Sequence, residues 1–155
     1  MKTVDNETNS APVWPDGKYC IFRYGGSCPI GLEIGSIHFD DDDRDSKVTG
    51  QHGGVVPDEV EQRWYNVRLY YCCKNTGNIV QPIELPYDKP FYLFRKDPTG
   101  CQQVRGMTAA EEFVHFNTHD GNDNSDSSTG SIPYTSTPPA RITAWEIHYC
   151  YYCPI

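Results

Sequence analysis

The chain has 155 residues, a formal net charge of -8 and a pI near 4.9. This length suits one domain with a core of its own. The acidic balance excludes a nucleic-acid partner, because no basic stripe is available to displace the counterions of a phosphate backbone. The longest apolar runs are far below the ~18–20 residues that a membrane span requires, so no span is expected.

The cysteine content indicates an oxidising compartment. Seven cysteines, eleven tyrosines and twelve prolines fit a turn-rich, disulfide-bonded β protein. We therefore expect secretion, with a leader trimmed before this sequence or replaced by Met1, since MKTVDNETNS lacks the apolar segment of a signal peptide. The sequon Asn6-Glu7-Thr8 agrees with an extracellular location. Residues 1–12 are predicted to be a polar tail, and residues 13–155 a single domain.

The second half of the chain repeats the order of features found in the first half. Each half contains an aromatic segment, a cysteine, a His-Phe pair followed by a polar, acidic stretch, and a closing aromatic segment. In the first half these are YCIFR (19–23), Cys28, IHFD (37–40) and VRLYYCC (67–73). In the second half they are FYLFR (91–95), Cys101, VHFN (114–117) and WEIHYCY (145–151). The predicted repeats span about residues 14–73 and 86–153.

These segments are predicted to be strands, because they are short, rich in β-branched and aromatic residues, and bounded by Gly, Pro, Asn and Asp. The one helix signal is the capping-box pattern of residues 108–111, TAAE. Its counterpart in the first half contains Gly35, so we expect at most one helical turn there. The predicted fold is all-β, a disulfide-stapled sandwich or flattened barrel built from two repeats related by a pseudo-twofold.

The repeat also predicts disulfide connectivity, which cysteine spacing alone cannot determine. Alignment of the two closing segments matches Cys72 with Cys150. The two halves also share the earlier cysteine, Cys28 in the first and Cys101 in the second. We therefore expect the bridges Cys28–Cys72 and Cys101–Cys150.

A third bridge is predicted from the cysteines that the second half lacks. Cys20 and Cys73 align with Tyr92 and Tyr151, so both are missing from the second half, as the members of a pair would be. This predicts the bridge Cys20–Cys73. Neighbouring strand residues point to opposite faces, which suits different partners for adjacent cysteines. Cys153 is then unpaired.

Several motifs occur in a fixed order along most of the chain. They are WPDGKYCIFRYGGSCPIG (14–31), YYCC (70–73), KPFYLFR (89–95), CQQVRGMT (101–108) and YCYY (149–152). This set resembles the C-terminal domain of apextrin, called ApeC, over about residues 14–153. The resemblance implies a secreted invertebrate module associated with extracellular matrix and with recognition of bacterial cell-wall components such as peptidoglycan fragments. It implies no catalytic motif.

The first acidic stretch, HFDDDDRDS (38–46), is either a calcium site or a solvated loop. Calcium takes oxygen ligands held by a turning backbone, which Asp, Asn and Ser supply. The candidate calcium ligands are Asp40, Asp42, Asp43 and Asp45. The second stretch, HFNTHDGNDNSDSSTG (115–130), lacks the spacing of an EF-hand and is less rich in aspartate than the resemblance leads us to expect.

The two His-Phe pairs lead to a hypothesis about a ligand-binding surface. Strand alternation places His38 and His115 on the face opposite the following phenylalanine, where they either are solvated or line a shallow groove. If a pseudo-twofold brings the two strand ends together, they form one surface with planar donors and acceptors. Its residues are His38, Asp40, Asp42, His115, Asn117 and Asp120.

Aromatic side chains in polar, loop-like surroundings are further candidates for sugar binding, because C–H faces of sugars stack on rings. These are Trp64, Tyr65, Tyr24 and Tyr134. Trp14, Trp145 and most strand tyrosines are predicted to belong to the core.

The leading hypothesis for function is a secreted, non-catalytic module that recognises microbial cell-wall or other glycans, with no required cofactor and calcium as an optional one. The alternative is a structural matrix or assembly module that binds calcium through its acidic loops and oligomerises, with Cys153 linking chains. We expect no enzyme activity, since no paired acid and base is marked by the sequence.

Overall fold

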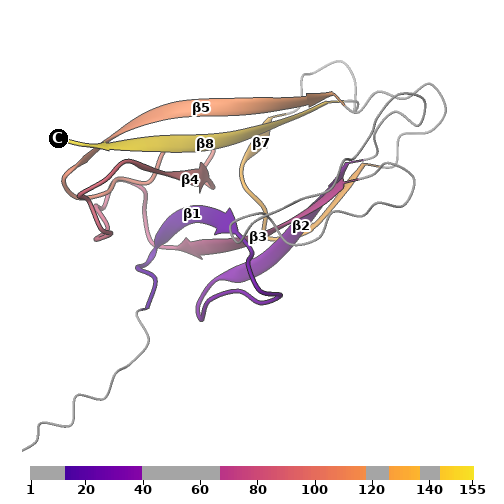
Figure 1. Ribbon diagram of the computed structural model, residues 1–155, viewed down its shortest axis with the longest axis horizontal. Coiled ribbons are helices and arrows are strands. Elements are labelled where there is room, and N and C mark those ends of the chain that lie inside the picture. Colours follow the sequence, from indigo (N-terminus) through magenta and orange to yellow (C-terminus); the bar gives the residue numbers. More distant parts are fainter. Residues whose placement is uncertain (1–12, 40–66, 118–125, 137–143) are drawn as a thin grey trace, which may run out of the picture.

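The computed structural model describes residues 13–39, 67–117, 126–136 and 144–155 (Figure 1). The strands in these ranges are β1 (Gly17–Phe22), β2 (Glu33–Phe39), β3 (Val67–Thr76), β4 (Phe91–Arg95), β5 (Met107–Asn117), β6 (Ser127–Gly130), β7 (Thr135–Ser136) and β8 (Ala144–Pro154). They form one open antiparallel sheet in the order β5-β8-β4-β1-β3-β2-β6, and β7 pairs with β8. The prediction of an all-β fold is confirmed.

The described ranges contain no helix, and therefore none long and apolar enough to cross a membrane. The helical turn predicted at residues 108–111 is wrong. Those residues belong to β5, which pairs with β8 along its whole length, from Met107 opposite Pro154 to Asn117 opposite Ala144. This continuous pairing outweighs a local capping signal.

Both halves of the chain have the same strand order. In the first half β3 lies between β1 and β2, and in the second β8 lies between β4 and β5. The register agrees as well, since Ile37 lies opposite Leu69 and Val114 lies opposite Ile147. β1 and β4 pair with each other and join the halves. The strand order is therefore repeated between the halves, while the predicted pseudo-twofold between them stays a prediction.

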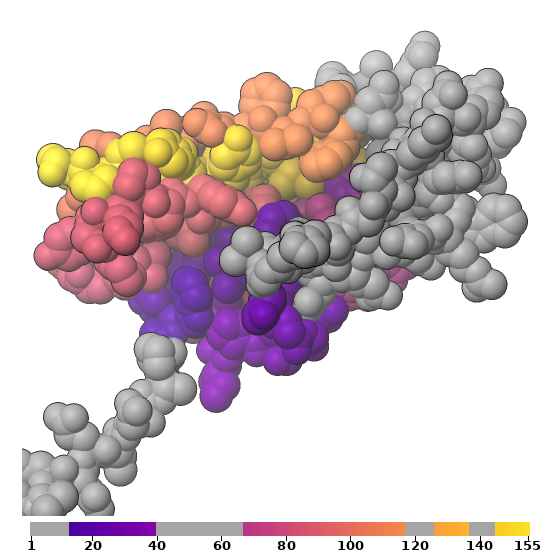
Figure 2. Space-filling view, viewed as in Figure 1, coloured from indigo at the N-terminus to yellow at the C-terminus, as the bar shows by residue number. Residues whose placement is uncertain are grey.

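The sheet folds over itself into two layers, with β4, β5 and β8 facing β1, β2 and β3 (Figure 1). Figure 2 shows the same arrangement with all atoms, with orange and yellow β5 and β8 along one side and the indigo-to-magenta strands along the other. The contact between layers is direct. Phe39 at the end of β2 stacks on Phe116 near the end of β5, with ring centroids 4.7 Å apart.

Two core clusters lie on the two faces of the sheet. The inner cluster, between the layers, contains Cys20, Ile37, Phe39, Tyr71, Cys73, Phe94 and Ile147. The other cluster contains Tyr19, Ile83, Leu93, Val104, Met107, Cys150 and Tyr152. Ile83 and Val104 come from the connections on either side of β4 and form a parallel bridge with each other. These connections therefore cover the outer face of β4 and β8.

A buried glutamine links these connections to the sheet through hydrogen bonds. Gln102 is 1% exposed, and its side-chain oxygen accepts a hydrogen bond from the Lys18 amide at 2.9 Å. Its side-chain amide donates to the carbonyl oxygen of Gln81 at 2.9 Å. Its backbone carbonyl oxygen accepts from the Tyr152 hydroxyl at 2.7 Å. Because these polar groups pair with one another, Gln102 can be buried without a large desolvation cost.

All three predicted disulfides are present. They are Cys20–Cys73, Cys28–Cys72 and Cys101–Cys150, and Cys153 is free. Cys20 and Cys73 lie directly opposite each other on β1 and β3. Tyr92 and Tyr151, which align with them in the repeat, lie directly opposite each other on β4 and β8. The alignment of the halves therefore identified equivalent positions of the sheet.

The segment with β6 and β7 links the layers, because β6 pairs with β2 and β7 pairs with β8. The chain approaches β2 closely at Gly35. A Cβ atom on Gly35 would overlap the backbone carbonyl of Ser131, whose amide donates to the carbonyl oxygen of Ile34 at 3.1 Å. Only a residue without a side chain allows this approach.

We expect Gly35→Ala to destabilise the domain by about 1–3 kcal/mol, because the added methyl group forces the β6–β7 segment away from β2. Thermal denaturation measures the effect. Gly100→Ala is the matched control, since its Cβ atom would lie 3.5 Å from the nearest atom, in ordinary contact. Equal melting temperatures for the two variants would show that the close approach of Ser131 to Gly35 does not limit the stability of the domain.

Candidate functional site

Seven of the predicted ligand-binding and calcium-site residues lie outside the described residues. These are Asp40, Asp42, Asp43, Asp45, Trp64, Tyr65 and Asp120. The calcium site and the contribution of these aromatic residues therefore stay predictions. Within the described ranges, no group of three or more His, Cys, Asp or Glu side chains is arranged to hold a metal ion.

The two strand ends that carry the His-Phe pairs do lie close together, as the stacked rings of Phe39 and Phe116 show. Because those rings point inward, alternation places His38 and His115 on the outer faces of the two layers. His115 is exposed, with its Nδ1 atom 3.9 Å from a carboxylate oxygen of Glu146. A shared surface would have to be built largely by residues outside the described ranges, so it stays a prediction.

The other predicted aromatic candidates have different surroundings. Tyr24 is exposed, in the turn after β1. Tyr134 is half-buried between the Arg95 guanidinium, 4.7 Å from its ring centroid, and the His148 ring at 5.0 Å. Tyr134 thus belongs to the link between layers rather than to an open surface. Trp14 and Trp145 pack against the two core clusters, as predicted.

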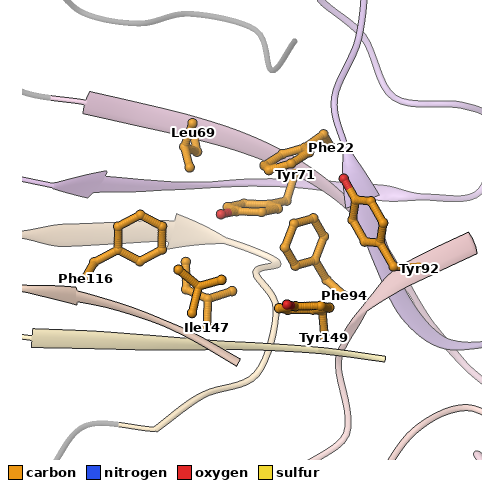
Figure 3. Close-up of a pocket in the computed structure, with 9 residues that line it drawn as sticks. Phe22, Leu69, Tyr71, Tyr92, Phe94, Phe116, Ile147 and Tyr149 are labelled. Atoms are coloured by element: carbon orange, nitrogen blue, oxygen red, sulfur yellow. The ribbon is translucent and has the colours of Figure 1, made fainter. Parts of the chain in front are cut away.

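An aromatic cleft of about 340 Å³ lies between the layers (Figure 3). Its described lining comes from β1, β3, β4, β5 and β8. The lining residues are Phe22, Leu69, Tyr71, Tyr92, Phe94, Val114, Phe116, Ile147 and Tyr149. This volume falls at the lower end of the range of about 300–1,000 Å³ that is typical of small-molecule sites.

The register explains why these side chains converge. One row of directly opposite residues crosses five strands, from Glu112 through Tyr149, Phe94 and Cys20 to Cys73. Residues that lie opposite each other in an antiparallel sheet share a face, so the whole row points between the layers. Because the sheet folds over itself, the part of this row on β4, β5 and β8 faces the layer that contains β1 and β3 (Figure 1).

The rim of the cleft, defined here as Tyr92, Tyr149 and Glu112, combines an exposed ring with polar groups. Tyr92 is 51% exposed, and its ring centroid lies 6.0 Å from that of Tyr149. The Tyr149 hydroxyl hydrogen-bonds the carboxylate of Glu112, which raises the pKa of Tyr149 above its usual value. The rim therefore presents an aromatic face beside a phenol–carboxylate pair.

Among the described lining residues, the interior of the cleft is apolar except for one phenol. Tyr71 is fully buried, and its hydroxyl has no hydrogen-bond partner among the described residues. Figure 3 shows this hydroxyl pointing toward the side of the cleft formed by Leu69, Phe116 and Ile147. Burial raises the pKa of Tyr71, so the group stays neutral at physiological pH.

The sequence interpretation missed this cleft because it assigned most strand tyrosines to the core. One signal was present in the repeat. The second half carries Tyr92 and Tyr151 where the first half carries the Cys20–Cys73 disulfide. Two tyrosine rings thus replace a compact disulfide, and this replacement indicates that the layer with β4 and β8 presents aromatic side chains at this position.

The family comparison agrees with the motifs of the sequence. The family model ApeC, described as the C-terminal domain of apextrin, matches residues 1–152. The chain belongs to the ApeC family. No curated protein and no solved structure matches it. The three disulfides of this ApeC domain are consistent with an extracellular protein.

We expect Tyr71→Phe and Tyr152→Phe to have different consequences for stability. Loss of the unpaired Tyr71 hydroxyl leaves the free energy of unfolding unchanged or raises it, because no bond is lost. Loss of the Tyr152 hydroxyl, which bonds Gln102 at 2.7 Å, lowers it by about 1–3 kcal/mol. Denaturant unfolding of both variants measures this. Equal destabilisation would mean that Tyr71 has a partner in the folded protein.

Proposed function

We propose that this ApeC domain is an extracellular, non-catalytic recognition module that binds microbial cell-wall or other glycans, such as peptidoglycan-like ligands, at the rim of the aromatic cleft. One observation carries the proposal. The exposed ring of Tyr92 lies beside the hydrogen-bonded pair of Tyr149 and Glu112. Membership of the apextrin family supports an extracellular recognition role.

The chemistry of the rim suits a sugar. The C–H face of a pyranose packs on an aromatic ring, while its hydroxyl groups need donors and acceptors fixed nearby. The Tyr92 ring supplies the flat face. Glu112 supplies carboxylate oxygens that accept from sugar hydroxyls, and its bond with Tyr149 holds it in place. Glu112 and Tyr149 lie directly opposite each other on β5 and β8, so strand pairing places the two side chains next to each other.

The composition of the cleft favours binding over hydrolysis. Glycoside hydrolysis uses two carboxyl groups on either side of the scissile bond. The nine described lining residues include no carboxylate, and the rim adds Glu112. The described part of the cleft thus offers one acid, where hydrolysis uses a pair.

We expect Tyr92→Ala to weaken retention on insoluble peptidoglycan, or binding on a glycan array, by about tenfold, the value of a lost stacking contact. Tyr87→Ala is the matched control, because Tyr87 is 58% exposed and does not line the cleft. Co-sedimentation with purified peptidoglycan measures the effect. The proposal fails if the unmodified domain binds no glycan, or if both variants bind equally well.

The alternative, a calcium-binding matrix or assembly module, depends on the acidic stretches, most of which lie outside the described residues, and on Cys153. The free thiol of Cys153 is partly exposed, near the C-terminal end of β8. The same co-sedimentation assay with and without calcium separates this alternative from recognition by the rim, because the rim contacts contain no metal ligand set.

A further inference from the structure

We propose that the interior of the aromatic cleft binds a neutral acyl group, with the Tyr71 hydroxyl donating a hydrogen bond to the carbonyl oxygen of that group. The site is distinct from the rim and does not depend on glycan binding. It rests on two observations: the cleft of about 340 Å³, and the buried Tyr71 hydroxyl, which has no hydrogen-bond partner among the described residues and is directed toward the Leu69, Phe116 and Ile147 side of the cleft (Figure 3).

The cleft is a half-open hollow of a size that the packing of an ordinary core does not leave. Protein interiors are packed as densely as organic crystals, with few voids larger than a water molecule. Here the inner faces of five strands leave a space that is lined by aliphatic and aromatic side chains. At its edge Val114 remains 45% exposed and Tyr92 51% exposed. An apolar occupant would recover the contacts that these side chains lack.

Water is a poor occupant of this space. A buried water molecule needs two to four polar partners, and about three on average. The interior offers the Tyr71 hydroxyl, surrounded by Leu69, Phe116 and Ile147. The other two phenols of the lining are those of Tyr92 and Tyr149, which belong to the rim. The Tyr149 hydroxyl interacts with the carboxylate of Glu112. A molecule that is mostly hydrocarbon with one acceptor atom fits the interior better than water does.

The Tyr71 hydroxyl needs a neutral hydrogen-bond acceptor, and a carbonyl oxygen is such an acceptor. The nine described lining residues contain no cationic side chain, so a buried carboxylate would remain uncompensated. Glu112 at the rim would also repel an anion. A ligand that donates a hydrogen bond would serve Tyr71 less well, because the phenol proton would still lack an acceptor. An ester or amide carbonyl on an acyl chain meets these conditions.

The Tyr71 hydroxyl is held in position before binding. Its ring stacks on Phe22, with centroids 5.4 Å apart, and meets Phe94 edge-on at 5.2 Å. The disulfide of the nearby Cys73 ties β3 to β1 on the same face of the sheet. Because the donor is already ordered, binding loses little side-chain entropy.

The experiment uses the full chain and the neutral fluorescent probe N-phenylnaphthylamine, displaced by methyl octanoate or by decane. We expect the emission of the probe to rise on binding, and methyl octanoate to displace it from the unmodified protein at about fivefold lower concentration than from Tyr71→Phe, the value of one hydrogen bond. Decane, which accepts no hydrogen bond, should displace the probe equally from both proteins. Equal displacement of the probe by the ester in both proteins overturns the role of Tyr71.

A second pair of variants tests the place of binding. Val114→Trp fills the cleft from a position that is already part-exposed and should abolish the probe signal. Phe113→Trp is the control, because Phe113 is the adjacent residue of β5, 57% exposed and on the opposite face. No signal in the unmodified protein, or equal signals in the two variants, overturns the site. Probe binding without peptidoglycan retention supports this site while the glycan proposal fails.

Discussion

The stacking of Phe39 on Phe116 is the contact on which the rest of the structure depends. These rings belong to β2 and β5, which lie far apart in the strand order of a single sheet. They meet because the sheet folds over itself, and this folding creates an interior between the layers. The same closure sends the preceding histidines outward. The cleft then extends from Phe116 to the exposed ring of Tyr92.

The two halves share their strand order but differ in what they present to that interior. On β1 and β3 the inner face carries a disulfide, Cys20–Cys73, which is compact and rigid. At the equivalent position, β4 and β8 carry Tyr92 and Tyr151. A repeat with identical inner faces would place two bridges opposite each other. The difference between the halves instead places the ring of Tyr92 in the lining of the cleft, while Phe22 and Tyr71 supply the rings of the layer that carries the disulfide.

The cleft has two chemically distinct regions, and this separation gives the two proposals one structural origin. The rim combines a flat ring with a phenol–carboxylate pair, whereas the interior combines hydrocarbon with the Tyr71 hydroxyl. The neighbouring arrangement suits an amphipathic ligand whose polar part contacts the rim and whose apolar part enters the cleft.

The sequence alone predicted the main strand segments, all three disulfides and the family, because a repeat with matched cysteines constrains which segments are linked. It misled at residues 108–111, where the capping pattern is local and the pairing of β5 with β8 is not. Only the tertiary structure decided which strand tyrosines line a cleft. Alternation shows that Tyr71 and Tyr149 have inward positions, but not what faces them, since that depends on how the sheet folds back.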